Sequence, residues 1–190
     1  VAENAENCSI ALNKGCGSIA TNAGHYSLAT TIKSFTIAAN TGDYSVAWGQ
    51  KAHSIAANIG EGSAALSGGY RSIAANTGGR SAAISYGEDS VAINVGNQST
   101  AINKAAKSVA LNMGGHAEAS VTEEGSIAIA TGIQSRAKGG LGSAIVLVER
   151  TTWNGYRYPL NNIKAVIVDG EKIKADTWYT LRNGEFVECD

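Results

Sequence analysis

The chain has 190 residues, of which 44% are hydrophobic, and it contains 23 glycines but only one proline. This composition excludes collagen, which needs abundant proline, and is too apolar for a disordered linker, so we expect the glycines to punctuate ordered turns. The formal net charge of -1, from 15 basic and 16 acidic side chains, argues against nucleic acid or an anionic membrane as a partner.

Cys8, Cys16 and Cys189 are too few for a disulfide scaffold and lack the spacing of a zinc site. We interpret them as free thiols, with a pair between Cys8 and Cys16 left open. The chain has no run of 18 apolar residues, so we expect no membrane insertion, and its first residues do not resemble a signal peptide. Because Val1 falls inside a repeat, we expect the chain to begin partway through a longer protein.

A nine-residue repeat runs without insertion through fifteen units, the first anchored at Ser9 and the last at Ser135. Each unit reads small, apolar, Ala, variable, Asn, variable, Gly, and then two polar or variable residues. The alanine is present in every unit, from Ala11 to Ala137. The first five positions alternate as a strand does, and the following Asn-x-Gly tolerates positive φ. Each unit therefore predicts one short strand and one turn at the Asn-x-Gly.

A second period of 18 residues lies over the first, because alternate units from Ser18 to Ser108 all carry Asn at the fifth position. The units between them mostly carry Thr, Gly or Ser there, with Asn13 and Asn103 as exceptions. We therefore predict coils of 18 residues with two strands each, which form two parallel sheets. Stacking would bring the asparagines into an amide ladder. The predicted ladder consists of Asn22, Asn40, Asn58, Asn76, Asn94 and Asn112.

Alternation puts the Ser, Ala and Asn positions on one side of each strand and the second and fourth positions on the other. Either side could be the interior. The unvarying alanine favours a cramped interior on its own side, and Glu118, Arg136 and Lys138 would be costly to bury on the other. An apolar column would then face outward, which favours an oligomer that covers it. This column is Ile19, Ile37, Ile55, Ile73, Val91, Val109 and Ile127.

The repeat frame ends near Gly139, and aromatic residues become frequent beyond it. We therefore divide the chain into a solenoid, residues 1–138, and a C-terminal β cap module, residues 139–190. A cap is expected because the open end of a solenoid would recruit other strands.

Two β-branched runs in the cap module, residues 143–149 and 163–168, predict strands. Asp169-Gly170 and Asn183-Gly184 each predict a hairpin turn between runs that can pair. Four aromatic residues have two interpretations, as the core of the module or as a platform on which a sugar could stack. They are Trp153, Tyr156, Tyr158 and Trp178.

The sequence offers no catalytic constellation, phosphate loop or metal motif, so we expect a protein that is not an enzyme and has no cofactor. His25, His53 and His116 lie in turns of distant coils, which argues against a shared metal site. Calcium-binding rolls share the period but need a recurring Gly-Gly-x-Gly-x-Asp. Two further solenoid activities, ice binding and glycan cleavage, are retained as minor alternatives.

Two resemblances rest on particular segments. Ser-Val-Ala-Ile-Asn at 90–94 and Ser-Ile-Ala-Ile-Ala at 126–130 resemble the repeats of trimeric autotransporter adhesin head (YadA-like) domains, although the coil length differs. Those heads are parallel β-rolls that form trimers and bind host matrix or cell surfaces. The Ser-x-Ala-x-Asn-Thr-Gly units and the ending at 168–179 are similar to nonapeptide-repeat β-solenoid proteins of gut bacteria and their phages. That resemblance covers nearly the whole chain and implies no catalytic residues.

The sequence thus predicts an all-β parallel β-solenoid, or β-roll, with 18-residue two-strand coils and a small C-terminal β-hairpin cap. The expected function is a non-catalytic structural or binding scaffold, adhesin-head-like or phage-associated. The alternative is a carbohydrate-binding module that uses the C-terminal aromatic residues. We expect a homo-oligomer, with a trimer favoured, and a host surface protein or glycan as partner. The cell surface or a phage particle is the favoured location, with the cytoplasm left open.

Overall fold

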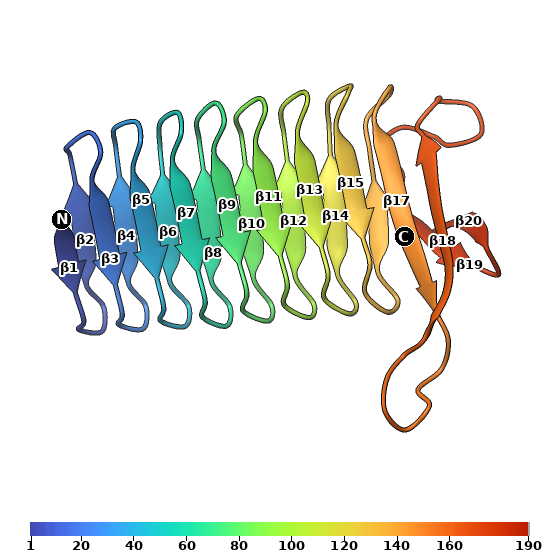
Figure 1. Ribbon diagram of the computed structural model, residues 1–190, viewed down its shortest axis with the longest axis horizontal. Helices are drawn as coiled ribbons and strands as arrows, with labels where there is room; N and C mark the ends of the chain where they lie inside the picture. Colours follow the sequence, from blue (N-terminus) through green and yellow to red (C-terminus); the bar gives the residue numbers. More distant parts are fainter. Residues whose placement is uncertain (190) are drawn as a thin grey trace.

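The chain forms an all-β rod, and the computed structural model describes it over residues 1–189. Short strands stack along the rod in two sheets, and successive strands of the repeat alternate between the sheets (Figure 1). Each strand from β1 to β14 pairs in parallel with the strand 18 residues further on, as Asn40 pairs with Asn58. The predicted β-solenoid with 18-residue coils of two strands is therefore confirmed.

Sheet A contains ten strands, and all of its neighbours are parallel except the last pair, β17 and β18. In spatial order its strands are β1 (Ala2–Asn4), β3 (Ile19–Asn22), β5 (Ile37–Asn40), β7 (Ile55–Asn58), β9 (Ile73–Asn76), β11 (Val91–Asn94), β13 (Val109–Asn112), β15 (Ile127–Ala130), β17 (Ala144–Arg150) and β18 (Leu160–Ile167).

Sheet B also contains ten strands, and it ends in two antiparallel strands, β19 and β20. In spatial order its strands are β2 (Ile10–Asn13), β4 (Leu28–Thr31), β6 (Val46–Gly49), β8 (Ala64–Ser67), β10 (Ala82–Ser85), β12 (Thr100–Asn103), β14 (Glu118–Val121), β16 (Arg136–Lys138), β19 (Tyr179–Arg182) and β20 (Glu185–Glu188).

The interior of the rod is lined by the small and polar positions of the repeat. Ala56, Ala65 and Ala74 have no exposed surface and belong to a core cluster that consists of alanines alone. The isoleucines at the second position of sheet A, such as Ile55 and Ile73, remain 37% exposed. The orientation favoured by the unvarying alanine is thus confirmed, because a methyl group is the largest side chain that the facing sheets accommodate there.

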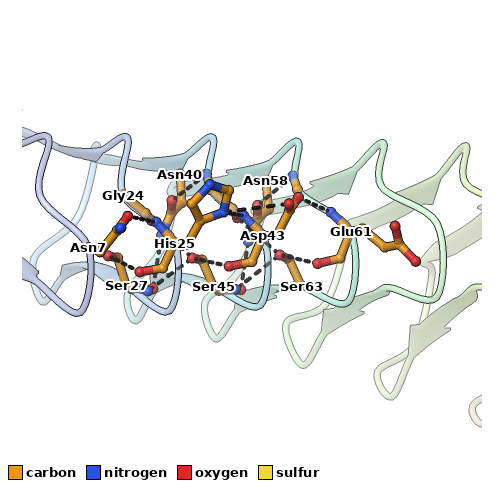
Figure 2. Close-up of polar contacts among 12 residues, drawn as sticks. Asn7, Gly24, His25, Ser27, Asn40, Asp43, Ser45, Asn58, Glu61 and Ser63 are labelled. Atoms are coloured by element: carbon orange, nitrogen blue, oxygen red, sulfur yellow. Dashed lines mark hydrogen bonds and ion pairs between the residues drawn. The ribbon is translucent and has the colours of Figure 1, made fainter.

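The anchor serines form the ladder that runs along this interior. The hydroxyl of Ser63 accepts a hydrogen bond from the backbone N–H of Ser45 at 3.0 Å, and Ser81 does the same for Ser63 at 3.2 Å. The Ser63 hydroxyl also lies 3.2 Å from the carbonyl oxygens of Gly42 and Glu61, to which it donates. Figure 2 shows Ser27, Ser45 and Ser63 linked in this way. Each buried hydroxyl therefore joins neighbouring coils.

The asparagine column is present, but the amide ladder predicted for it is wrong. The Asn76 amide nitrogen donates to the Ser63 carbonyl at 2.9 Å, and its oxygen accepts from the Gly78 N–H at 3.0 Å. All six predicted asparagines, from Asn22 to Asn112, make this pair of bonds. Each amide thus caps its own turn and reaches the start of a sheet B strand, which leaves no donor aimed at the next asparagine.

The turn geometry also differs from the expectation. Positive φ occurs at the ninth position of the units, immediately before the anchor, as at Tyr44 (φ 54°) and His53 (φ 57°), rather than at the Asn-x-Gly. The glycine of that motif serves a different purpose. A Cβ at Gly78 would lie well inside van der Waals contact with the backbone carbonyl of Gly60. Glycine is required there because consecutive turns pack backbone against backbone.

At the C-terminal end the strands continue to stack in parallel, but larger apolar side chains occupy the interior. β17 pairs in parallel with β15 through Ile127 and Ala144, so the stack continues past residue 138 with a coil one residue shorter. Ile145 and Leu147 replace the small interior residues and join an apolar cluster. The hairpin at Asn183-Gly184 is confirmed, with positive φ at both residues as a type I′ turn requires.

The predicted hairpin at Asp169-Gly170 is wrong, because the strands on its two sides lie in different sheets. β18 pairs with β17 in sheet A, whereas β19 pairs with β16 in sheet B. The Asp169 carboxylate instead accepts hydrogen bonds from the N–H groups of Glu171 and Ile173, and these bonds lower its pKa. Asp169-Gly170 therefore begins the connection that crosses from one sheet to the other.

Two neighbouring glycines test the close approach of consecutive turns. We expect Gly78→Ala to lower the free energy of unfolding by about 3 kcal/mol, because its methyl group would collide with the Gly60 backbone. Gly79→Ala is the matched control, since a Cβ there meets nothing closer than the Asn97 carbonyl at 3.7 Å. Urea denaturation followed by circular dichroism measures both variants. Equal destabilisation by the two substitutions would contradict this account of the turns.

Candidate functional site

The outer side of sheet A is one continuous apolar surface, which we call the apolar face. It consists of the second and fourth positions of the repeat units that contain the sheet A strands from β3 to β15, and none of these residues is charged. The second positions are Ile19, Ile37, Ile55, Ile73, Val91, Val109 and Ile127. The fourth positions are Thr21, Ala39, Ala57, Ala75, Ile93, Leu111 and Ile129.

The apolar face extends into the C-terminal strands. Ala144 and Val146 of β17 pair with Ile167 and Ala165 of β18, and Ile163 follows in the same alternation. Ile163 and Ile167 are 62% and 65% exposed. Nine strands, β3 to β18 of sheet A, at about 4.8 Å and four residues at about 3.3 Å give the face roughly 600 Å². That is close to the roughly 800 Å² that each partner buries in a standard protein interface.

The outer side of sheet B is different, because it becomes charged toward the C-terminus. Glu118 and Arg136 lie on adjacent strands, and the guanidinium nitrogens of Arg136 donate to the Glu118 carboxylate at 2.7 and 3.1 Å. Arg136 and Lys138 also lie over the ring of Trp178, at 4.8 and 4.9 Å from its centre. Trp178 is therefore a cation–π partner on sheet B.

The structure brings together three of the four aromatic residues for which a sugar platform was considered. Trp153 and Tyr158 lie with ring centres 5.1 Å apart, and both line a hollow of about 700 Å³ together with Tyr156. Trp178 does not line it. Trp153 and Tyr156 are 54% and 82% exposed, so the interpretation of these residues as the module's core is wrong for them.

Sequence reasoning did not identify the aromatic residues that do fill the core. Tyr179 is buried and packs edge-to-face against the partly buried Phe186, with ring centres 6.4 Å apart. Their places in the alternating strands β19 and β20 carried the signal that could have separated them from the exposed aromatic residues.

Two carboxylates, Glu118 and Glu149, line another hollow of about 930 Å³ near the C-terminal end. Glu149 accepts hydrogen bonds from the Asn162 amide at 2.6 Å and from the N–H groups of Asn183 and Gly184 at 2.7 and 2.9 Å. These bonds lower the pKa of Glu149, whereas a glycosidase needs a general acid of raised pKa. Since Glu118 is engaged by Arg136, the geometry favours a structural role for both groups.

The histidines lie in the turns, as expected. The His25 Nδ1 atom accepts a hydrogen bond from the Asp43 N–H at 3.1 Å, and Figure 2 shows this contact within a column that includes Asn7, Asp43 and Glu61. His53 stacks on Phe35 with ring centres 4.6 Å apart. Within residues 1–189, no three His, Cys, Asp or Glu side chains come close enough together to hold a metal ion.

The three cysteines are unpaired in the structure, so the pair left open between Cys8 and Cys16 is not formed. Over the described residues, no helix is long and apolar enough to cross a membrane.

Comparison with known proteins gave no relatives. No protein-family model, no curated protein and no solved structure matches the chain.

The hydrogen-bonded carboxylate of Glu149 predicts a pH dependence of stability. Because its folded pKa is lowered, its contribution is present above its unfolded pKa and is lost as the pH falls through the folded value. We therefore expect Glu149→Gln to unfold at a lower temperature than the wild type at about pH 7, with a difference that shrinks as the pH falls below the unfolded pKa and through the lowered folded pKa. Calorimetry measures this, with Glu171→Gln, a substitution of an exposed residue, as the control. A difference that does not change with pH would contradict the assignment.

Proposed function

We propose that the chain is a non-catalytic structural scaffold that assembles with copies of itself through the apolar face of sheet A. The single observation that supports this function is the absence of any charged side chain over the described strands β3 to β15 of that face. Its roughly 600 Å² is as large as the largest apolar patches found on soluble monomers. Covering the face with a second copy removes this surface from water.

A homotrimer is the assembly we favour. The support is the resemblance of the 90–94 and 126–130 segments to trimeric adhesin heads, together with an interior too narrow to accept the isoleucines. In such an assembly sheet A of each copy faces the common axis, whereas sheet B and the turns face outward. The rod then presents repeated surfaces to a partner, in the manner of an adhesin head or a phage structural protein.

The outer face of sheet B carries charged side chains, and this difference from sheet A supports an assembly in which sheet A faces the common axis. Glu118 and Arg136 occupy the second position of their repeat units, where sheet A has Ile or Val. Each is about 30% exposed and paired with the other. Burial of such groups in an interface costs more than burial of isoleucine, so the apolar face is the better contact surface.

Light scattering after size-exclusion chromatography tests the proposal. We expect the wild type to have the mass of a trimer and Ile55→Glu/Val91→Glu to be a monomer, since each copy would bury two unpaired carboxylates. The two sites lie two coils apart, which limits repulsion within one chain. Circular dichroism checks that the variant remains folded.

The matched control is Val46→Glu/Ala82→Glu, which places the same two charges at the same positions of sheet B. We expect it to retain the wild-type mass. A wild-type monomer at micromolar concentration, or equal dissociation of both double variants, would contradict assembly through sheet A. A wild-type dimer would retain the interface and overturn the trimer.

A further inference from the structure

A hollow of about 410 Å³ opens on the outer face of sheet B, in the N-terminal half of the rod. Its walls are Trp48 of β6, at the outward fourth position of its repeat unit, and Tyr86, which directly follows β10. Leu66 of β8 lies between them in the stacking order, as Figure 1 shows for the three strands. Gln50, Lys51 and Gly68 complete the lining. We call this hollow the Trp48 slot.

The repeat explains why the slot is open. Gln50, Gly68 and Tyr86 occupy the same sixth position in three successive coils, so the glycine leaves a gap between two large side chains. A Cβ at Gly68 would lie 2.9 Å from the Gln50 carbonyl oxygen, closer than real Cβ contacts. The backbone itself therefore holds the gap, which is formed before any ligand arrives.

The aromatic walls are unusually accessible. Trp48 and Tyr86 are 43% and 48% exposed. Lys104 lies one coil beyond Tyr86, opposite to Gly68 in the stacking order, with its Nζ 5.2 Å from the ring centre. Tyr86 itself lines the slot, and the indole of Trp48 offers a second flat surface there.

The charge around the slot is positive. Lys51 lines it, Lys104 stands behind Tyr86, and no carboxylate is among the lining residues. The nearest acidic side chain along the chain is Glu88, which lies further round the turn and does not line the slot. A ligand with an anionic group beside a flat apolar surface would complement this arrangement, because Lys51 could pair with the charge while the rings cover the flat side.

We propose that the Trp48 slot binds an acidic sugar unit of a polysaccharide. The apolar face of a pyranose ring packs against Trp48 and Tyr86, its carboxylate or sulfate pairs with Lys51, and its hydroxyls reach the Gln50 amide or water. A slot of about 410 Å³ on the outer surface of a sheet suits one unit of a chain that continues in both directions. This binding site goes beyond the proposed scaffold, because sheet B faces away from the assembling apolar face.

Isothermal titration calorimetry with three acidic oligosaccharides tests the proposal. The probes are trigalacturonate, a hyaluronan hexasaccharide and a chondroitin sulfate hexasaccharide, and the methyl ester of trigalacturonate is the uncharged match. We expect at least one acidic probe to bind, with affinity lowered by about tenfold or more in Trp48→Ala and in Lys51→Glu. Trp153→Ala, which alters the C-terminal aromatic residues instead, should bind as the wild type does.

Several results would overturn the proposal. The first is that no acidic probe binds at millimolar concentration. The second, if trigalacturonate is the probe that binds, is that its methyl ester binds equally well. The third is that Trp48→Ala leaves the binding unchanged. Light scattering on ligand-free Trp48→Ala provides a further check. A change in its mass would show that the slot is a contact between copies, which also overturns the sugar site.

Discussion

The serine hydroxyls along the inside of the rod are the constraint on which the rest of the structure depends. Most of them accept a hydrogen bond from a backbone N–H of a neighbouring coil and lie within reach of two carbonyls, as Ser63 does. These short polar side chains can satisfy buried backbone groups only if the two sheets lie close together. The alanine between anchor and asparagine is therefore the largest apolar residue that fits, and the apolar bulk of each strand has to face outward.

This inversion of the usual core explains why the rod has large apolar and aromatic side chains on its outer surfaces. Most β-structures bury isoleucine between their sheets, but here Ile55 and Ile73 remain on the outer side of sheet A. The two outer sides have diverged. Sheet A repeats one uncharged pattern from β3 to β15, whereas sheet B varies from the aromatic Trp48 to the Glu118–Arg136 pair. A uniform outer side, as on sheet A, suits contact with identical copies of the chain. A varied outer side, as on sheet B, suits recognition of a different molecule.

The sequence predicted the coil length, the two sheets and the inward face because stacking repeats one small set of contacts in every coil. The unvarying alanine, together with the charged Glu118, Arg136 and Lys138 on the other side, favoured the interior that the structure shows, although the pattern alone left both sides open. The role of Asn76 was misjudged because an amide can bond along the column or within its own turn, and only the positions of Ser63 and Gly78 decide between them.

Where the repeat ends, the sequence was less informative. Asp169 and Gly170 are residue types that favour a hairpin turn. The strands on their two sides nevertheless pair with the last strands of the parallel stack in different sheets, β18 with β17 and β19 with β16. The C-terminal aromatic residues could not be divided into core and surface without knowing which belong to strands. The Trp48 slot was not predicted because its lining residues come from three successive coils. Gly68 contributes only by lacking a side chain, which no motif in the sequence indicates.

Ala117 provides the most direct test of the hydroxyl ladder, because it is the one anchor in its column without a hydroxyl group between Ser99 and Ser135. Ala117→Ser should restore the acceptor for the Ser99 N–H and raise the free energy of unfolding by about 1 kcal/mol in urea denaturation. Ala110→Ser makes the same change at a buried strand position away from the ladder and should lower that free energy by about 1 to 3 kcal/mol. Destabilisation by both substitutions would contradict the account.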